Sequence, residues 1–339
     1  MKKIISLLFV LVVIAVLGAC GSEDSTSGSE DGIQEHSIIL THDVPDTHIK
    51  HQASEKFKEY IESESDGKIT VEIYGNNTLF DTANQYQNVA SNNTQFIISD
   101  MSRMVDVHPA FNIPSLPFLF DSNEASMEFW QGESGQEILE SFEKDGVKGL
   151  AVWPNGTKHI MNNGTAITSP EDVNGLKLRV QGGQLLNETY AALNANSQSM
   201  GIDELYTSIE TGVVDGLENT FGALESFNFD EVTDYLTVTG HNRIDYVLQT
   251  NTEFWDSLNE PTKELIENGI KEATEYAVQT SDRLNEESFE RLVERENVEI
   301  IELTEDQIEV FRQTFEPLYD KWAPEIGEKH LEEIYNNRN

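Results

Sequence analysis

The chain has 339 residues, of which 61 are acidic and 22 are basic, so its formal net charge at pH 7 is −39. This length allows two lobes or one large domain with a sizeable core, and the acidity argues against a nucleic-acid partner, whose phosphates need a basic face. We favour an acidic, solvated surface suited to salty surroundings over a calcium store, because the sequence has no D-x-[DN]-x-[DN]-G loop.

The N-terminus has the pattern of an export signal. It reads MKKIISLLFVLVVIAVLGAC, and its apolar run is somewhat short for a membrane-spanning helix, which needs roughly 20 residues. Cys20, the only cysteine, directly follows Leu17-Gly18-Ala19 and so resembles the lipobox of bacterial lipoproteins. The resemblance implies a signal peptide at 1–19, cleavage before Cys20 and lipidation of its sulfur. An ordinary signal peptide with a chance cysteine is the alternative, and no second thiol exists for a disulfide.

The stretch GSEDSTSGSEDGIQE after Cys20 predicts a flexible acidic tether over residues 20–35. A chain of this composition has an end-to-end distance of roughly 20 Å. The tether would hold the folded body just off a membrane surface. Repulsion between anionic headgroups and the acidic body would keep the body from lying flat on the membrane.

Strands and helices alternate in the first part of the body. Residues 37–41 predict a strand, and a helix follows from about His48 with apolar residues at 3–4 spacing on one face. Residues 69–74 alternate as a second strand, a short helix opens near Asp81, and 96–98 form a third strand. This alternation predicts parallel βαβ units and hence an α/β fold.

The pattern continues beyond an apolar, proline-containing connector at 111–120. We expect helices at about 123–144, 184–194, 204–211 and 304–319, and strands at 149–153, 176–180, 246–249 and 298–301. From Pro261 to about Glu296, a helical pattern of about 35 residues would span roughly 50 Å. That length exceeds one small lobe, so we expect this helix to brace two.

The sequence offers no motif for catalysis and no convincing metal site. It lacks a G-x-S-x-G elbow, a P-loop, a G-x-G-x-x-G after a strand and an H-E-x-x-H pair. His48 and His51 lie one helical turn apart and could contact one ion, but a polar helix start explains them better. We therefore expect neither an enzyme nor a cofactor.

The run KLRVQGG at 177–183 is the best candidate for a binding site. Alternation places Lys177 and Arg179 on one face of a strand, and a solvated basic face is the plain interpretation. However, Arg179 lies at the carboxyl end of the strand, where open α/β sheets bind ligands, and Gly182 and Gly183 allow a close approach of the backbone. Asn219 occupies the same position after a second short strand.

These stretches resemble the solute-binding proteins of tripartite ATP-independent periplasmic (TRAP) transporters, and the resemblance extends from Ser37 to Tyr335. Its segments, in chain order, are SIILTHDVPDTHIKHQASEKFKEYIESESDGKITVEIY, IPSLPFLFD, NGLKLRVQGG, ETGVVDGLENTF, VTGHN and TEFWDSLNE. Each segment alone is a weak match to the family, but the six segments in this order are a specific one.

The resemblance implies a periplasmic-binding-protein-like α/β fold in which two lobes close over a ligand cleft and a long helix braces them. We place lobe I at 36–155 with 245–284, and lobe II at 156–244 with 285–339. In the family, the arginine of the RV strand forms a bidentate pair with the ligand carboxylate, and the asparagine of the D-G-x-E-N element contacts the same group. The matching residues here are Arg179 and Asn219.

One position departs from the family pattern. Many members carry a second arginine about twenty residues before the RV strand, where this chain has Lys158 or His159. Lys158 can supply charge but no planar fork. His241 matches a histidine near the pocket of some members or caps a strand end, and Trp153 and Phe221 would wall the pocket or belong to the core.

One arginine can hold an anion inside so acidic a body. An ion pair at 4 Å is worth about 4 kcal/mol at an effective dielectric constant near 20, whereas the screened surface charges together cost less than about 1 kcal/mol.

The resemblance therefore implies a monomeric, membrane-anchored receptor that captures a small organic acid outside the cytoplasm and hands it to a TRAP-type permease. An ABC-type receptor for another solute, a sensor subunit for a signalling kinase and an unrecognised hydrolase are the alternatives.

Overall fold

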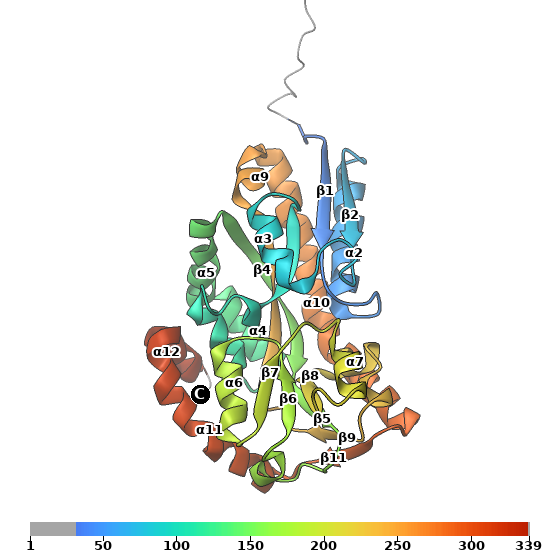
Figure 1. The fold of residues 1–339 in the computed structure, drawn as a ribbon. Helices are drawn as coiled ribbons and strands as arrows, with labels where there is room; N and C mark the ends of the chain where they lie inside the picture. Colours follow the sequence, from blue (N-terminus) through green and yellow to red (C-terminus); the bar gives the residue numbers. More distant parts are fainter. Residues whose placement is uncertain (1–31, 338–339) are drawn as a thin grey trace, which may run out of the picture.

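The computed structural model describes residues 32–337, so the predicted signal peptide, Cys20 and most of the predicted tether lie outside the described residues. The strands form two mixed sheets, which occupy the upper and lower halves of Figure 1. The upper sheet has the order β2-β1-β3-β10-β4, with β1 at His36–Thr41, β2 at Ile69–Tyr74, β3 at Phe96–Asp100, β10 at Arg243–Asn251 and β4 at Val147–Thr157. Strands β1, β2 and β3 run parallel, whereas β10 is antiparallel to β3 and β4.

The lower sheet has the order β11-β9-β5-β8-β6-β7. Strand β6, which contains Arg179, runs parallel to β7 and β8, whereas β5 is antiparallel to β8 and β9. The bounds are Glu299–Glu302 for β11, Tyr235–Val238 for β9, His159–Asn162 for β5, Gly216–Asn219 for β8, Lys177–Val180 for β6 and Asn196–Ser199 for β7.

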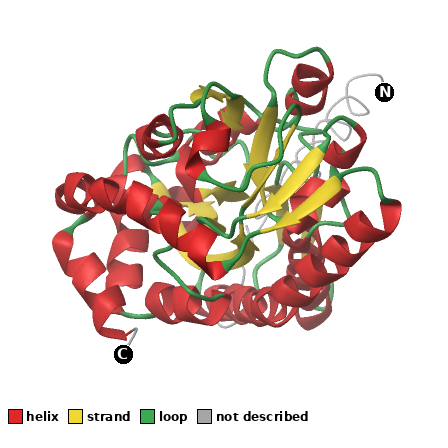
Figure 2. Cartoon of the chain, turned by 90° about the horizontal axis from the view of Figure 1, so that it is seen from below, coloured by secondary structure: helices red, strands yellow, loops and turns green. Residues whose placement is uncertain are grey.

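Helices lie on the outside of both sheets (Figure 2). Those of the upper half are α2 (Ile49–Glu64), α3 (Gln85–Ala90), α4 (Asn123–Gln131), α5 (Glu133–Glu140) and α9 (Thr252–Ser257), with 3₁₀ turns η1 (Thr82–Asn84), η2 (Met101–Arg103), η3 (Pro109–Ser115) and η4 (Ser141–Asp145). Those of the lower half are α6 (Gln184–Ala192), α7 (Leu205–Glu210) and α8 (Phe221–Ser226), with η5 (Pro170–Val173) and η6 (Phe229–Glu231). The C-terminal helices are α10 (Glu260–Arg295), α11 (Glu305–Ile326) and α12 (Glu328–Asn337).

The α/β fold and the long helix are confirmed. Helix α10 has 36 residues, about 54 Å at 1.5 Å per residue. Its first half buries Ile266, Ile270 and Ala273 in the core of the upper sheet, and Leu292 near its end packs into the core of the lower half. One helix thus contributes to two hydrophobic cores and resists their separation.

The predicted helix at 123–144 is wrong as a single element. The chain forms α4 and α5, which are separated by Gly132 in an extended conformation, and then the turn η4. A Cβ on Gly135 would lie 2.5 Å from the backbone Cα of Trp130. The close contact between the two helices therefore requires glycine, which the 3–4 spacing of apolar residues does not reveal.

Three strands of the lower sheet, β5, β7 and β9, were not predicted. The edge strand β7 reads NSQS and has no apolar residue, so no hydrophobic alternation marks it. Its pairing with β6 rather than its composition makes it a strand.

The chain passes between the two halves at Lys158, between β9 and β10, and through α10. Helix α11 contributes Phe311 and Phe315 to a core cluster that also contains Met104 of the upper half, and Ser134 of α5 donates a hydrogen bond to Glu333 of α12. The C-terminal helices thus contact both halves, and the lobe boundaries given above stay a prediction.

The last residues of the predicted tether belong to the folded body. Gly32 O accepts a hydrogen bond from Asn259 Nδ2 at 2.8 Å, and Gln34 N donates to Thr262 Oγ1 at 2.9 Å at the start of α10. Within residues 32–337, no helix is both long and apolar enough to cross a membrane.

Candidate functional site

A cavity with an empty volume of about 360 Å³ lies between the two sheets, at the carboxyl ends of parallel strands from both. The carboxyl ends of parallel strands meet at one edge of a sheet, where open α/β sheets bind ligands. Polar residues of both halves lie at this edge. The upper half contributes Asp43, His48, Lys50, Asp100, Arg103 and Tyr246, and the lower half contributes Arg179, Gln181 and Asn219. Apolar walls come from Val44, Ile202, Ala223, Phe227 and Ile244.

Arg179 is the central cation of the site, and it is buried, with 1 % of its surface exposed. Its Nε and Nη2 donate to Met200 O at 3.1 and 2.9 Å, which fixes the guanidinium plane. Its Nη1 has no hydrogen-bond partner among the described residues. Burial and the nearby Arg103 lower the pKa of Arg179 to about 10, so it remains charged at neutral pH. A buried, unpaired N–H of a cation is a strong site for an anion.

Gln181 presents a second donor of this kind. Its Oε1 accepts a hydrogen bond from Lys158 Nζ at 3.4 Å, so the opposite end of its amide carries the Nε2 donor. That nitrogen is buried and unpartnered within the described chain.

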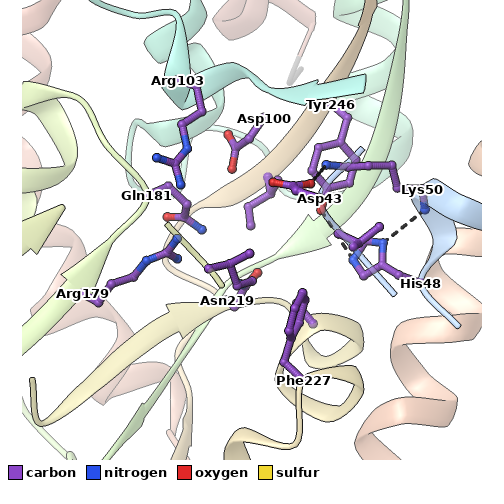
Figure 3. A pocket seen from close by; sticks show the side chains of 14 residues that line it. Asp43, His48, Lys50, Asp100, Arg103, Arg179, Gln181, Asn219, Phe227 and Tyr246 are labelled. Carbon is purple, nitrogen blue, oxygen red and sulfur yellow. Dashed lines mark hydrogen bonds and ion pairs between the residues drawn. The ribbon is translucent and has the colours of Figure 1, made fainter. Parts of the chain in front are cut away.

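Arg103 reaches the same end of the cavity from the upper half, and its Nη2 lies 3.4 Å from Met200 O, the acceptor that Arg179 also uses. Figure 3 shows Arg103 of η2 pointing toward Arg179 of β6 and Gln181, which directly follows β6. Asn219 Oδ1 accepts from the N–H of Thr220 at 2.9 Å, which leaves its amide nitrogen as a donor.

The opposite end of the cavity contains a closed ion pair. Lys50 Nζ lies 2.6 Å from Asp43 Oδ1 and 3.8 Å from the centre of the Tyr246 ring. Burial by itself would raise the pKa of Asp43, but Lys50 holds it at about 2. His48 lies beside this pair, and burial and Lys50 lower its pKa to about 3, so it is neutral. This end therefore offers polar groups without an unpaired lysine.

Of the residues predicted from sequence, Arg179 and Asn219 lie in the cavity wall. Arg179 is on a buried face of β6, so the interpretation of a solvated basic face is wrong at this residue, although Lys177 is exposed.

Lys158 and His241 instead meet behind the wall at a buried carboxylate. Lys158 Nζ lies 2.6 Å from Glu218 Oε1, and His241 Nε2 lies 2.9 Å from Glu218 Oε2, which also accepts from Tyr190. Burial by itself would raise the pKa of Glu218, but Lys158 and His241 hold it well below its usual range. A direct ligand contact by Lys158 or His241 stays a prediction, and the geometry assigns both to this buried network.

The remaining predicted residues, Trp153, Phe221 and Gly182, lie outside the cavity lining. Trp153 is buried in the core of the upper half, and its Nε1 donates to Thr274 Oγ1 at 2.9 Å. Phe221 stacks on His159 with ring centroids 3.9 Å apart. A Cβ on Gly182 would lie 3.6 Å from Ser102 O. None of the three is among the described residues that line the cavity, and their predicted role at the ligand stays a prediction.

Sequence reasoning missed Asp43, Lys50, Asp100, Arg103 and Gln181. A usable signal was present, because all five follow or end strands whose carboxyl ends face the cavity, or lie at the start of the next helix. His48 is the N-cap of α2 and accepts from Lys50 N, which confirms the interpretation of a polar helix start. Within the described residues, no cluster of histidine, aspartate or glutamate could hold a metal ion.

Comparison with known proteins gives a consistent result. Residues 40–325 match the model of the DctP family, described as bacterial extracellular solute-binding protein, family 7. The chain is 32 % identical to the C4-dicarboxylate-binding periplasmic protein DctP of Rhodobacter capsulatus over 292 residues, which cover 86 % of this chain and 87 % of that protein.

Two solved structures show the same architecture. A TRAP periplasmic solute-binding protein from Shewanella oneidensis with bound succinate superposes with a TM-score of 0.86 at 27 % identity, covering 88 % of this chain and 98 % of that one. The sugar acid binding protein DctPAm of Advenella mimigardefordensis, in complex with galactonate, gives a TM-score of 0.86 at 27 % identity and covers 90 % and 98 %.

Proposed function

The chain belongs to the DctP family, family 7 of the bacterial extracellular solute-binding proteins, and from this premise we propose that it captures a small organic acid and delivers it to a TRAP-type permease. The relatives are receptors rather than enzymes, and they include proteins described with bound succinate and galactonate. The cavity offers groups that bind an acid.

The observation that carries the proposal is the pair of unpartnered donors at one end of the cavity. Arg179 Nη1 and Gln181 Nε2 are both buried without a hydrogen-bond partner in the described chain. Leaving a buried donor unpaired costs about 1–3 kcal/mol, and more for a charged group. A ligand carboxylate has two oxygens and a negative charge, so it would satisfy both donors and remove that cost.

Closure of the two halves follows from the same geometry. Arg103 of the upper half and Arg179 of the lower half share Met200 O as acceptor, and the charge of Arg103 contributes to lowering the pKa of Arg179. An anion between them relieves this repulsion. A bound carboxylate would thereby favour the arrangement in which the two halves meet, and differential affinity for the two arrangements drives such a change.

The proposal is tested by titration calorimetry of the full-length protein in mild detergent with a panel of organic acids. Arg179→Met should weaken the binding of the cognate acid by at least about 100-fold, because it removes the positive charge and the free Nη1 donor that would bind the carboxylate. Arg179→Lys retains charge and should restore only part of this loss, since an ammonium lacks the planar fork.

Lys177→Met is the matched control, because Lys177 lies two residues earlier on the same strand and its side chain is 53 % exposed. We expect unchanged affinity for that variant. Equal affinity of wild type and Arg179→Met for every acid that binds would contradict the proposed site.

We also propose that a lipid on Cys20 anchors the protein at the outer face of the cytoplasmic membrane or in the periplasm. The LGAC motif supports this. Cys20→Ser should abolish incorporation of labelled fatty acid and release the protein from membranes. Delivery to a permease is tested by uptake of the labelled acid in a strain without the gene, which wild type should restore and Arg179→Met should not.

A further inference from the structure

The two ends of the cavity differ in charge. At one end Arg103 and Arg179 both lie near Met200 O, and at the other Lys50 is neutralised by Asp43 at 2.6 Å. Asp100 also lines the cavity, and Figure 3 shows it between Arg103 and Asp43.

Asp100 is held in place by the backbone rather than by a cation. Its Oδ1 accepts from Ser102 N at 2.9 Å, where Asp100 caps the turn η2. Among the described residues it forms no ion pair, and a carboxylate has room for further hydrogen bonds. Asp100 therefore presents acceptors and a negative charge to the cavity.

The charges of the cavity wall suit a ligand with a single negative charge. Lys50, Arg103 and Arg179 contribute three positive charges, and Asp43 and Asp100 contribute two negative charges. A monoanion brings the sum to zero, whereas a dianion leaves one negative charge in excess and a zwitterion one positive charge. Uncompensated charge in a buried site is costly.

The space beyond Asp100 has both polar and apolar lining residues. A second cavity with an empty volume of about 600 Å³ adjoins the first and shares Asp43, Asp100 and Arg103 with it. Thr82, Gln85 and Ser99 add hydroxyl and amide groups that donate and accept hydrogen bonds, and Ala83, Tyr86 and Met104 complete the lining with apolar surface. A carbon chain that carries hydroxyl groups fits such a lining better than a second carboxylate does.

We propose that Asp100 determines specificity by rejecting a second carboxylate, so that the ligand is a hydroxylated monocarboxylic acid of the sugar-acid type. This inference rests on the proposed function, since both assign the acid group of the ligand to Arg179, Arg103 and Gln181. It adds that hydroxyl donors of the ligand bind Asp100, which lies between Arg103 and the Lys50–Asp43 pair.

The test compares ligands that differ in one feature. Gluconate, galactonate and glucuronate represent hydroxylated monoacids, hexanoate lacks the hydroxyl groups, succinate carries a second carboxylate and ectoine is zwitterionic. By titration calorimetry at fixed salt, at least one hydroxylated monoacid should bind at least about tenfold more tightly than each of the other three. Tighter binding of succinate, hexanoate or ectoine would overturn the inference.

Asp100→Asn retains the size of the side chain and removes its charge. It should raise the affinity for succinate by about tenfold and lower the affinity for the hydroxylated acid, because the repulsion of a second carboxylate is lost while a weaker acceptor remains. Unchanged selectivity in this variant would overturn the role of Asp100.

Failure of this inference is distinguishable from failure of the proposed function. If Arg179→Met abolishes binding of succinate and succinate is the preferred ligand, the acid receptor stands and the assignment of a hydroxylated monoacid is wrong. If Arg179→Met has no effect on any acid, the proposed function itself is wrong.

Discussion

Lys158→Met tests whether Lys158 serves the ligand or the fold. In the structure its Nζ lies 2.6 Å from Glu218 Oε1, and both side chains have 1 % or less of their surface exposed. The substitution leaves Glu218 as a buried carboxylate that retains hydrogen bonds from Tyr190 and an interaction with His241. Methionine fills nearly the same volume, so the change removes charge rather than packing.

Breaking one partner of a buried ion pair typically costs 3–5 kcal/mol, because the remaining charge has lost its compensation. The surviving partners of Glu218, which are Tyr190, His241 and Asn242, reduce that cost. We therefore expect the free energy of unfolding to fall by about 3 kcal/mol at pH 7. The loss should shrink in acid. Without Lys158 the pKa of Glu218 rises from its low position in the wild type, because burial raises it and Lys158 no longer opposes that effect. Protonation as the pH falls therefore stabilises the folded variant relative to the wild type.

The assay is urea unfolding followed by tryptophan fluorescence at pH 5 and pH 7, for wild type, Lys158→Met, Glu218→Gln and the double variant. The double variant should recover most of the loss, because no buried charge remains without a partner. Ligand affinity of the folded Lys158→Met protein should change by less than about tenfold, since Lys158 does not line the cavity and contacts its wall at Gln181. A loss of stability below about 1 kcal/mol, together with a loss of affinity above about 100-fold, would refute the structural role and restore Lys158 as a ligand cation.

Three further outcomes follow from the structure. Trp153→Phe should lower the free energy of unfolding by about 1–3 kcal/mol, through lost core packing and the lost hydrogen bond to Thr274, with an unchanged dissociation constant by calorimetry. Gly183→Ala should lower the melting temperature clearly, because φ is +84° and a Cβ would lie 2.6 Å from a neighbouring side chain, whereas Gly182→Ala should melt like wild type because its nearest new contact is 3.6 Å. Acid binding should be constant from pH 5 to 9 in calorimetry and weaken above pH 10, since the pKa of Arg179 is about 10 and only its charged form pairs with a carboxylate; affinity that falls between pH 6 and 8 would contradict this.

Much of the fold could be predicted because local pattern and packing agree. Along α2, Ile49, Ala53, Phe57 and Ile61 repeat at a spacing of four residues and all four are buried. The pattern failed where contacts between distant segments decide the structure. Nothing local marks β7 as a strand, and a single glycine such as Gly132 does not by itself show that a helix ends there.

For the site, the pattern of strands predicted that Arg179 and Asn219 lie where parallel sheets bind ligands, because each is at the carboxyl end of a short strand. Both do line the cavity. The remainder of the cavity depends on contacts between segments that are far apart in the sequence. Arg103 and Arg179 are far apart in the chain and meet at Met200 O because β3 and β6 belong to different sheets whose ends face one another. The same applies to Lys158, whose charge the sequence offers to a ligand. In the folded protein Lys158 pairs with Glu218, which is buried on the neighbouring strand. A buried carboxylate without a cation would be strongly destabilising.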